Sequence, residues 1–125
     1  MKEKQKAKPA ASVILFRPTE ANGFEVFLTR RPDGMAFLGG MYCFPGGVLR
    51  EEDCSAAMLR LCHGLSPLEA RKIVGAQFSP QQALGLWIAG IRELFEEAGI
   101  LLAVSHFGQP LAAGPKKNLA GHGEA

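Results

Sequence analysis

The stretch Arg92–Ile100 (RELFEEAGI) gathers carboxylates that could do chemistry. Stepped at about 100° per residue around a helix, Glu93, Glu96 and Glu97 share one sector roughly 100° wide, opposite an apolar stripe. A solvated helix face with an Arg92–Glu96 pair would explain such a pattern in isolation. Three like charges near a helix C-terminus, however, repel one another and oppose the helix dipole. A bound cation relieves that crowding, and carboxylate oxygens suit Mg²⁺ or Mn²⁺.

A second stretch, Phe44–Gly47 (FPGG), completes a pattern with the first. Together they resemble the Nudix box, the signature of Nudix hydrolases. RELFEEAGI fits its second half, Arg-Glu-U-x-Glu-Glu-x-Gly-U, with U a bulky aliphatic residue. Gly47 followed by Asp53 fits the spacing of the first half, Gly-x5-Glu, with Asp in place of Glu. The residues between, about 54–84, look like a helical insertion, so we expect one site split along the chain.

The resemblance implies a role for each matching residue. Metal ligands would be Glu93, Glu96, Glu97 and the carbonyl of Gly46, whose lack of a side chain leaves the backbone accessible. Glu93 would be either a ligand or the base that orients the attacking water, and Arg92 would assist catalysis. Substrate-binding positions would be Arg30, Arg31 and Gly47, although the two arginines also fit solvated loop charges, and Gly46–Gly47 also fits a plain turn. Gly99 would be structural, as the left-handed end of the helix.

The substrate expected from the resemblance is a nucleoside diphosphate linked to another group. Nudix hydrolases that cleave coenzyme A (CoA) or acyl-CoA carry Leu-Leu-Thr-x-Arg, a glycine and Phe-Pro-Gly-Gly before the box, and the similar FLTRR (Phe27–Arg31), Gly40 and FPGG occur here. Pro32 replaces a usual small polar residue and Ala36 an arginine, which weakens the CoA assignment. ADP-ribose or a dinucleotide is the alternative substrate.

Composition excludes several other classes of protein. A chain of 125 residues with 47% apolar and 21% charged residues predicts one globular domain. The net charge of +2 argues against nucleic acid as a partner, and no apolar run is long enough to cross a membrane. The three cysteines are an odd number without metal-site spacing. They predict free thiols in a reducing compartment, and we expect a cytoplasmic protein.

Apolar and β-branched runs predict the strands. We expect a hairpin of Ala11–Phe16, stopped by Pro18, with Phe24–Thr29, then a loop over Arg30–Gly40. Two further strands are expected, at Met41–Phe44, closed by the turn Pro45–Gly47, and at Ile100–Val104.

Capping signals predict the helices. A helix is expected over residues 51–64, ending at Gly64. Ser66-Pro67 with Glu69, and Ser79-Pro80 with Gln82, are capping boxes that begin two more. The last runs to Gly99, and its apolar stripe, including Trp87 and Phe95, is expected to be core rather than a surface for stacking bases.

These elements give a mixed α/β (α+β) fold, a Nudix-like α/β/α sandwich. We expect residues 1–10 to be a disordered basic leader, 11–104 a partial Nudix domain and 105–125 a loop or disordered tail. Because the Nudix fold continues with more strands and a helix after its box helix, the sandwich is expected to be incomplete at its C-terminus. Two interpretations follow: a metal-dependent diphosphatase, or a catalytically silent fragment that serves as a subunit or binding module. An oligomer, or a missing C-terminal half, is the expected partner.

Overall fold

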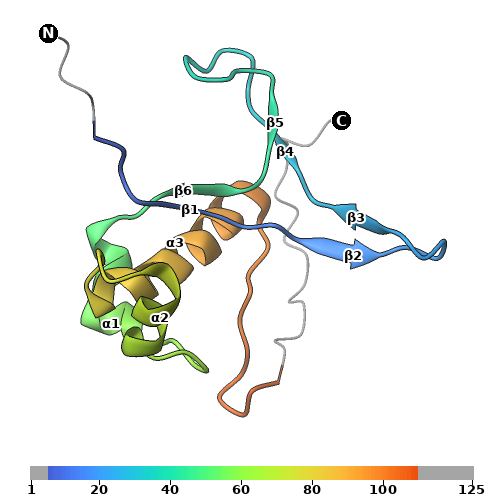
Figure 1. Ribbon diagram of the computed structural model, residues 1–125. Coiled ribbons are helices and arrows are strands. Elements are labelled where there is room, and N and C mark those ends of the chain that lie inside the picture. Colours follow the sequence, from blue (N-terminus) through green and yellow to red (C-terminus); the bar gives the residue numbers. More distant parts are fainter. Residues whose placement is uncertain (1–5, 110–125) are drawn as a thin grey trace, which may run out of the picture.

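A computed structural model describes residues 6–109 of the chain. Within these residues six short strands precede four helical segments, so the expected mixed α/β fold is confirmed. The helices gather on one side of a two-stranded ladder, while two further strand pairs extend away from it (Figure 1). Residues 1–5 of the expected leader and 110–125 of the expected tail lie outside the described residues, whereas Ala10, expected in the leader, is the first residue of a strand. No helix in the described part is long and apolar enough to cross a membrane.

The strands form three antiparallel pairs. β1 (Ala10–Ser12) pairs with β6 (Gly46–Val48), β2 (Phe16–Pro18) with β3 (Phe24–Val26), and β4 (Thr29–Arg30) with β5 (Tyr42–Cys43). The expected hairpin is present in part as β2–β3, since Ala11 and Ser12 of its expected first strand pair with β6 instead. The strand expected near Tyr42 is present as β5. The β1–β6 pair brings the first strand of the chain against the two glycines of FPGG, with Ala11 opposite Gly47 and Ser12 opposite Gly46.

Three strand predictions need correction. Gly46–Val48 was expected to begin as a turn but is a strand, because β1 supplies the partner for its backbone. The expected strand Ala11–Phe16 is divided into the end of β1 and the start of β2, although β2 does end at Pro18 as predicted. Ile100–Val104 is not a strand, apart from a single bridge residue at Val104. Leu101 and Leu102 are exposed, and an apolar run becomes a strand only where another strand takes up its backbone groups.

The expected helix over residues 51–64 is two short segments instead. η1 (Glu51–Cys54) is a 3-10 turn, and α1 (Ala56–Leu59) follows it. Ser55, between them, has an extended backbone, and its side chain accepts a hydrogen bond from the Met58 amide. This serine therefore starts a new helix rather than continuing the first.

The two predicted capping boxes are both confirmed. α2 (Pro67–Val74) begins with Ser66 and Glu69 bonded reciprocally, and α3 (Pro80–Ala98) begins with Ser79 and Gln82 in the same way. α3 ends as predicted at Gly99, whose φ of 68° is left-handed. The boundaries of the helix that carries the carboxylates were thus encoded locally.

α3 is the central element, with helices on one face and strands on another (Figure 1). Ala70 of α2 packs with Ala83 and Leu84 of α3, and side chains of the predicted insertion and the loop before α3 surround them: Leu59, Cys62, Leu65, Val74 and Phe78. Toward η1 and the segment that follows β1, small residues allow close approach. A Cβ at Gly90 would lie 3.1 Å from a Val13 methyl, and one at Gly85 would lie 2.6 Å from the Cys54 sulfur.

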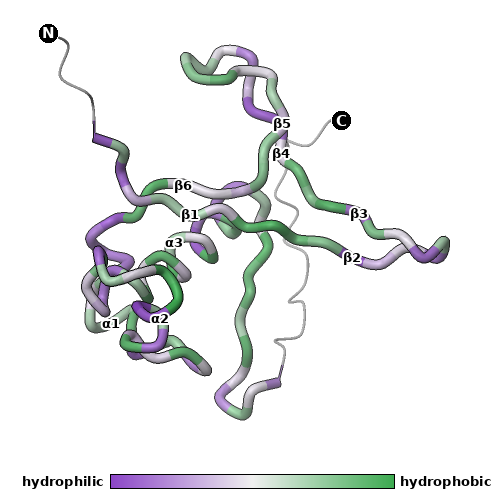
Figure 2. Tube along the Cα trace, viewed as in Figure 1, coloured by the Kyte–Doolittle hydropathy of each residue, from purple (hydrophilic) through white to green (hydrophobic). Residues whose placement is uncertain are grey.

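The predicted apolar stripe of α3 is only partly buried. Leu84, Ile88 and Leu94 are in the core, whereas Trp87 and Phe95, expected to be core, are 36% and 52% exposed. Figure 2 shows further apolar stretches outside the helical part, in the β2–β3 hairpin and after α3. All three cysteines are free and half-buried, as predicted.

Leu94 has the largest fully buried apolar side chain among the described residues, and it offers a test of this core. We expect Leu94→Ala to lower the free energy of unfolding by about 2–5 kcal/mol, because it removes buried methyl groups and leaves a cavity. Leu68→Ala, on α2 with Leu68 64% exposed, is the matched control and should change little. Urea unfolding of both variants measures the difference, and equal effects would contradict the assignment of the core to α3.

Candidate functional site

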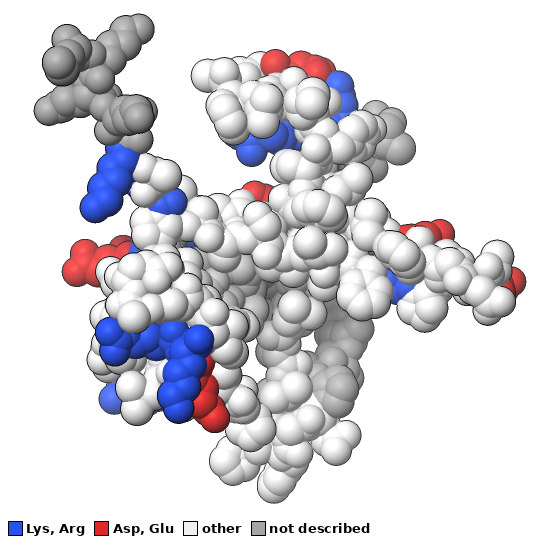
Figure 3. All heavy atoms as spheres, in the orientation of Figure 1, with Lys and Arg blue, Asp and Glu red and all other residues white. Residues whose placement is uncertain are grey.

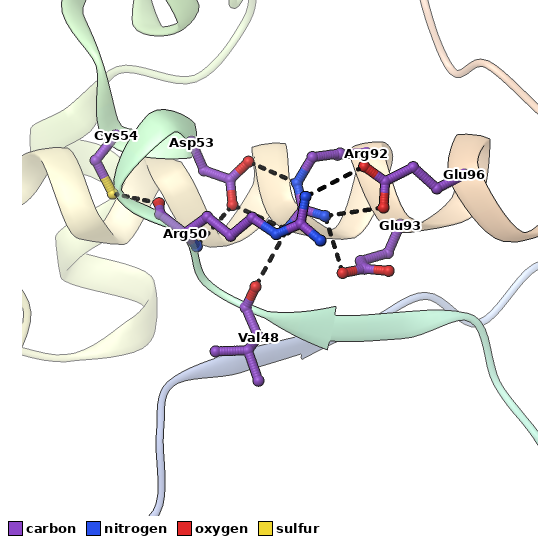
Figure 4. Close-up of polar contacts among 7 residues, drawn as sticks. All are labelled: Val48, Arg50, Asp53, Cys54, Arg92, Glu93 and Glu96. Atoms are coloured by element: carbon purple, nitrogen blue, oxygen red, sulfur yellow. Dashed lines mark hydrogen bonds and ion pairs between the residues drawn. The ribbon is translucent and has the colours of Figure 1, made fainter. Parts of the chain in front are cut away.

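Arg92 joins the two halves of the split motif (Figure 4). Its Nε lies 2.8 Å from Asp53 Oδ1 and its Nη2 lies 3.1 Å from Asp53 Oδ2, a two-pronged ion pair. Nη2 also donates to the Val48 carbonyl at 3.1 Å. α3 is thereby tied to β6, which begins with the two glycines of FPGG, and to η1, which follows it.

Asp53 is 2% exposed, and η1 positions it. Its Oδ2 accepts a hydrogen bond from the Arg50 amide at 2.9 Å, so the carboxylate closes the start of the 3-10 turn. Burial alone would raise the pKa of Asp53. The hydrogen bonds from Arg92 and from the Arg50 backbone, with the charges of both arginines, outweigh burial and hold that pKa below its ordinary value. Asp53 is therefore a structural anion.

Arg92 also holds two of the three carboxylates predicted as metal ligands. Its Nη1 lies 2.9 Å from Glu93 Oε1 and 3.2 Å from Glu96 Oε2, so the predicted i,i+4 pair is present. Arg50 adds a contact of 3.4 Å to the other oxygen of Glu96. Glu93 is not the solvated acid that the helical sector suggested: its side chain is only 13% exposed, because β6 covers it.

Gly46 and Gly47 are required by close packing in this structure. A Cβ at Gly47 would overlap the Glu93 carboxylate and lie 2.9 Å from its Cγ. A Cβ at Gly46 would overlap the Ala11 carbonyl oxygen and lie 2.9 Å from Ser12 Cα. The two glycines therefore allow β6 to lie between β1 and the acidic end of α3.

The register of β1 and β6 directs the backbone of Gly46 toward α3. The Val13 amide bonds the Pro45 carbonyl and the Leu49 amide bonds the Pro9 carbonyl, so Ala11 and Gly47 form the hydrogen-bonded pair between them. The amide and carbonyl of Gly46 thus point away from β1. A backbone hydrogen bond from Gly46 reaches Glu97.

Glu97 is exposed, and its pKa is raised. The largest cause is the loss of water around the part of the side chain that lies against the protein. The negative charges of Glu93 and, to a smaller extent, Glu96 also raise the pKa of Glu97. The Gly46 hydrogen bond and the positive charge of Arg31 act in the opposite direction. Three carboxylates therefore crowd one end of α3, although Arg92 neutralises two of them.

The predicted phosphate-binding arginines behave differently. Arg31 lies close enough for its charge to act on Glu97. The guanidinium of Arg30 is instead engaged by Asp33 of its own loop, at 2.7 Å. Two residues of the site were not predicted to have a function. The motif spacing identified Asp53 but assigned it no role, and no motif in the sequence pointed to Arg50.

The donor atoms suit a divalent cation in their chemistry, and the carboxylates share one end of α3. Glu93, Glu96 and Glu97 lie within one turn of α3, and the Gly46 carbonyl points away from β1; all four offer the hard oxygens that Mg²⁺ or Mn²⁺ prefers. Within residues 6–109, however, no three acidic, histidine or cysteine side chains already converge as a metal cage. Glu93 and Glu96 are held by Arg92, and Glu96, with 42% of its side chain exposed, has room to turn.

A fold that brings the two halves of this motif together defines a class of protein, the Nudix hydrolases, and comparison with known proteins agrees. No family model matches the chain. It is similar to a crystal structure of a NUDIX hydrolase from Alicyclobacillus acidocaldarius, with a TM-score of 0.65 and 30% identity, over 86% of this chain and 44% of that one. It is also 30% identical over 117 residues to human acyl-coenzyme A diphosphatase NUDT19, covering 77% of this chain and 31% of that protein.

The chain is similar to Nudix hydrolases in sequence and in fold, as its split motif predicted. It spans about a third of the length of the human relative and less than half of the bacterial one. The similarity therefore extends over part of each relative.

The Arg92–Asp53 pair predicts a large cost for its removal. We expect Asp53→Asn to lower the free energy of unfolding by about 3–5 kcal/mol, because one partner of a buried ion pair is lost and Arg92 stays behind. Asp33→Asn is the matched control, since Asp33 also pairs with an arginine but its side chain is 77% exposed. Urea unfolding at pH 7 measures both, and similar small effects would contradict the structural role of Asp53.

The same pair predicts acid sensitivity. Because folding lowers the pKa of Asp53, its contribution is complete above the unfolded pKa of about 3.9 and is lost as the pH falls through the lower folded value. The stability difference between wild type and Asp53→Asn should therefore be constant from pH 7 to about pH 5 and shrink below about pH 4. A difference that grows on acidification would contradict the direction of the shift.

Proposed function

We propose that this chain carries the catalytic site of a divalent-metal-dependent Nudix diphosphatase that hydrolyses a nucleoside diphosphate linked to another group. The proposal depends on one observation: the Arg92–Asp53 ion pair joins the separated halves of the motif and sets Gly46 beside Glu97. CoA or acyl-CoA is the substrate we favour. Support comes from the FLTRR…FPGG pattern and from the human relative, which is named an acyl-coenzyme A diphosphatase.

The cofactor in this proposal is Mg²⁺ or Mn²⁺, held by Glu96 and Glu97 with the Gly46 carbonyl. Such a cation neutralises charge on the diphosphate and lowers the pKa of a bound water. Glu93 serves as a third ligand or as the base that orients the water. Its burial against Gly47 fixes the carboxylate in one place, which suits either role.

Arg92 is a positioning residue in this scheme. Arg92 forms ion pairs with Glu93 and Glu96, and Asp53 in turn holds Arg92 in place. The two glutamate carboxylates therefore have fixed positions before the substrate binds. Arg31, close to Glu97, supplies positive charge for a substrate phosphate, and Arg30 would join it only after leaving Asp33. With CoA, the products are 3′,5′-ADP and phosphopantetheine.

A second candidate function is a catalytically silent Nudix-like binding module. It is favoured by the contacts of Arg92 and Arg50, which occupy Glu93 and Glu96 and compete with a cation for them. A diphosphatase acting on ADP-ribose or a dinucleotide remains the alternative within the enzyme class, supported by the replacement of a pattern arginine by Ala36.

Metal dependence and charge removal test the proposal. We expect hydrolysis to require Mg²⁺ or Mn²⁺ and to stop in EDTA. Glu96→Gln and Glu97→Gln should each lower kcat by about 10²-fold or more, because each removes a charged metal ligand. Glu20→Gln, an exposed acid in the β2–β3 turn, is the control and should leave kcat unchanged.

Calorimetry with Mn²⁺ alone separates the two candidate functions. Binding that is lost in Glu97→Gln, without hydrolysis of CoA, ADP-ribose or a dinucleotide, favours the binding module. Hydrolysis that persists in EDTA or in both glutamine variants contradicts the metal site.

A further inference from the structure

Arg50 reaches the acids of α3 from a different part of the fold. It is the residue that begins η1, and its Nη1 lies 3.4 Å from Glu96 Oε1. The other carboxylate oxygen of Glu96, Oε2, lies 3.2 Å from Arg92 Nη1. Glu96, which the proposed function makes a metal ligand, is thus held between two guanidinium groups (Figure 4).

The two arginines differ in their freedom to move. The Arg92 side chain is 18% exposed and is bonded to Asp53 through both Nε and Nη2. The Arg50 side chain is 55% exposed, and within residues 6–109 it forms an ion pair with Glu96 alone. Arg50 also lines a hollow of about 340 Å³, which gives its guanidinium space to move. Of the two contacts to Glu96, the one from Arg50 can therefore open while the Arg92–Asp53 pair stays intact.

The backbone of Arg50, in contrast, is fixed. Its amide donates to Asp53 Oδ2 at 2.9 Å, and its carbonyl accepts a hydrogen bond from the Asp53 amide at 3.1 Å. Both bonds use main-chain atoms of Arg50, so they do not depend on which side chain occupies this position. The Arg50 side chain can therefore change partners, or be replaced, without releasing Asp53.

The surroundings of Arg50 are acidic. Glu51 and Glu52 follow it in η1 and are exposed, and Figure 3 shows acidic atoms on the surface where β6 leads into the helices. Glu96 faces Arg50 from α3. Because like charges repel, a guanidinium this close to Glu96 opposes a divalent cation on the same carboxylate. Arg50 and a metal ion are therefore competitors for Glu96.

We infer that Arg50 has two alternating partners: it holds Glu96 in the protein without ligand, and it contacts a phosphate oxygen of the nucleoside diphosphate once Glu96 has turned to a divalent cation. The inference rests on the proposed function and adds a positioning and substrate-binding residue to its site. A guanidinium released from a carboxylate retains five N–H donors, and phosphate oxygens match that planar fork. Exchange of the carboxylate for a phosphate keeps Arg50 paired in both states.

Mn²⁺ binding measured by calorimetry tests the first partner without requiring turnover. Arg50→Ala should bind Mn²⁺ about fivefold more tightly than wild type, because the competing cation is gone. Arg50→Lys keeps the charge and should bind Mn²⁺ as wild type does. Arg17→Ala is the matched control, since Arg17 is also an exposed arginine paired with one exposed glutamate, Glu25, and it should change nothing. In a Glu96→Gln background, Arg50→Ala should give no gain.

Binding of ADP at saturating Mn²⁺ tests the second partner. Arg50→Ala should bind ADP about tenfold more weakly than wild type, because a charge-assisted hydrogen bond to phosphate is lost. Arg50→Lys should recover part of that loss, and Arg17→Ala should match wild type. A purely structural role of Arg50 would weaken the binding of both Mn²⁺ and ADP. Opposite changes in the two affinities therefore distinguish the exchange of partners from a loss of structure.

Several results would overturn the inference. These are equal Mn²⁺ affinities of Arg50→Ala and wild type, a gain that persists in the Glu96→Gln background, or an affinity for ADP that Arg50→Ala leaves unchanged. Failure of the proposed function is distinguishable. Opposite changes without hydrolysis of CoA, ADP-ribose or a dinucleotide refute the enzyme and keep the two partners of Arg50. Metal-dependent hydrolysis with both affinities unchanged in Arg50→Ala does the reverse.

Discussion

The ion pair between Arg92 and Asp53 is the contact on which the candidate site depends. It links α3 to the segment that follows FPGG, and the same guanidinium reaches Val48, Glu93 and Glu96. One planar cation with five donors can satisfy a buried carboxylate in two-pronged fashion and still hold two more acids, which a lysine cannot do. Without this arginine, three carboxylates and a buried aspartate would repel one another at the end of one helix.

Close packing of backbone segments brings the partners of this ion pair together. β6 passes over Glu93 only because Gly47 has no side chain, and β1 pairs with β6 only because Gly46 has none. On α3, Gly85 and Gly90 play the same part toward Cys54 and Val13. Small residues at these points allow β6, η1 and α3 to pack closely against one another. Large apolar residues are few in the core of the described part of the chain.

What the sequence predicted depended on how local each signal was. The capping boxes at Ser66 and Ser79 and the left-handed Gly99 involve neighbouring residues, and all three are present. The β1–β6 pair and the burial of Glu93 depend on segments far apart in the chain, and neither followed from periodicity. Trp87 and Phe95 lie on the correct helical stripe, but a stripe becomes core only where another element covers it. For the site, motif spacing identified the three glutamates and Asp53. The contacts of Arg50 with Asp53 and Glu96, and the ion pair between Asp53 and Arg92, could be recognised only from the three-dimensional structure.

The separation of Asp53 from Arg92 by 39 positions also sets an order of events during synthesis. At about 5–20 residues per second, the arginine follows the aspartate by roughly 2–8 seconds. Both strands of the β1–β6 pair are made before that interval, so the ladder with its two glycines is complete in sequence while its helix is still being made. The partner of Asp53 arrives only near the end of α3, after the segment that forms α1 and α2. Assembly of the acidic end of α3 is therefore a late, long-range step, which must close a large loop before it gains an ion pair.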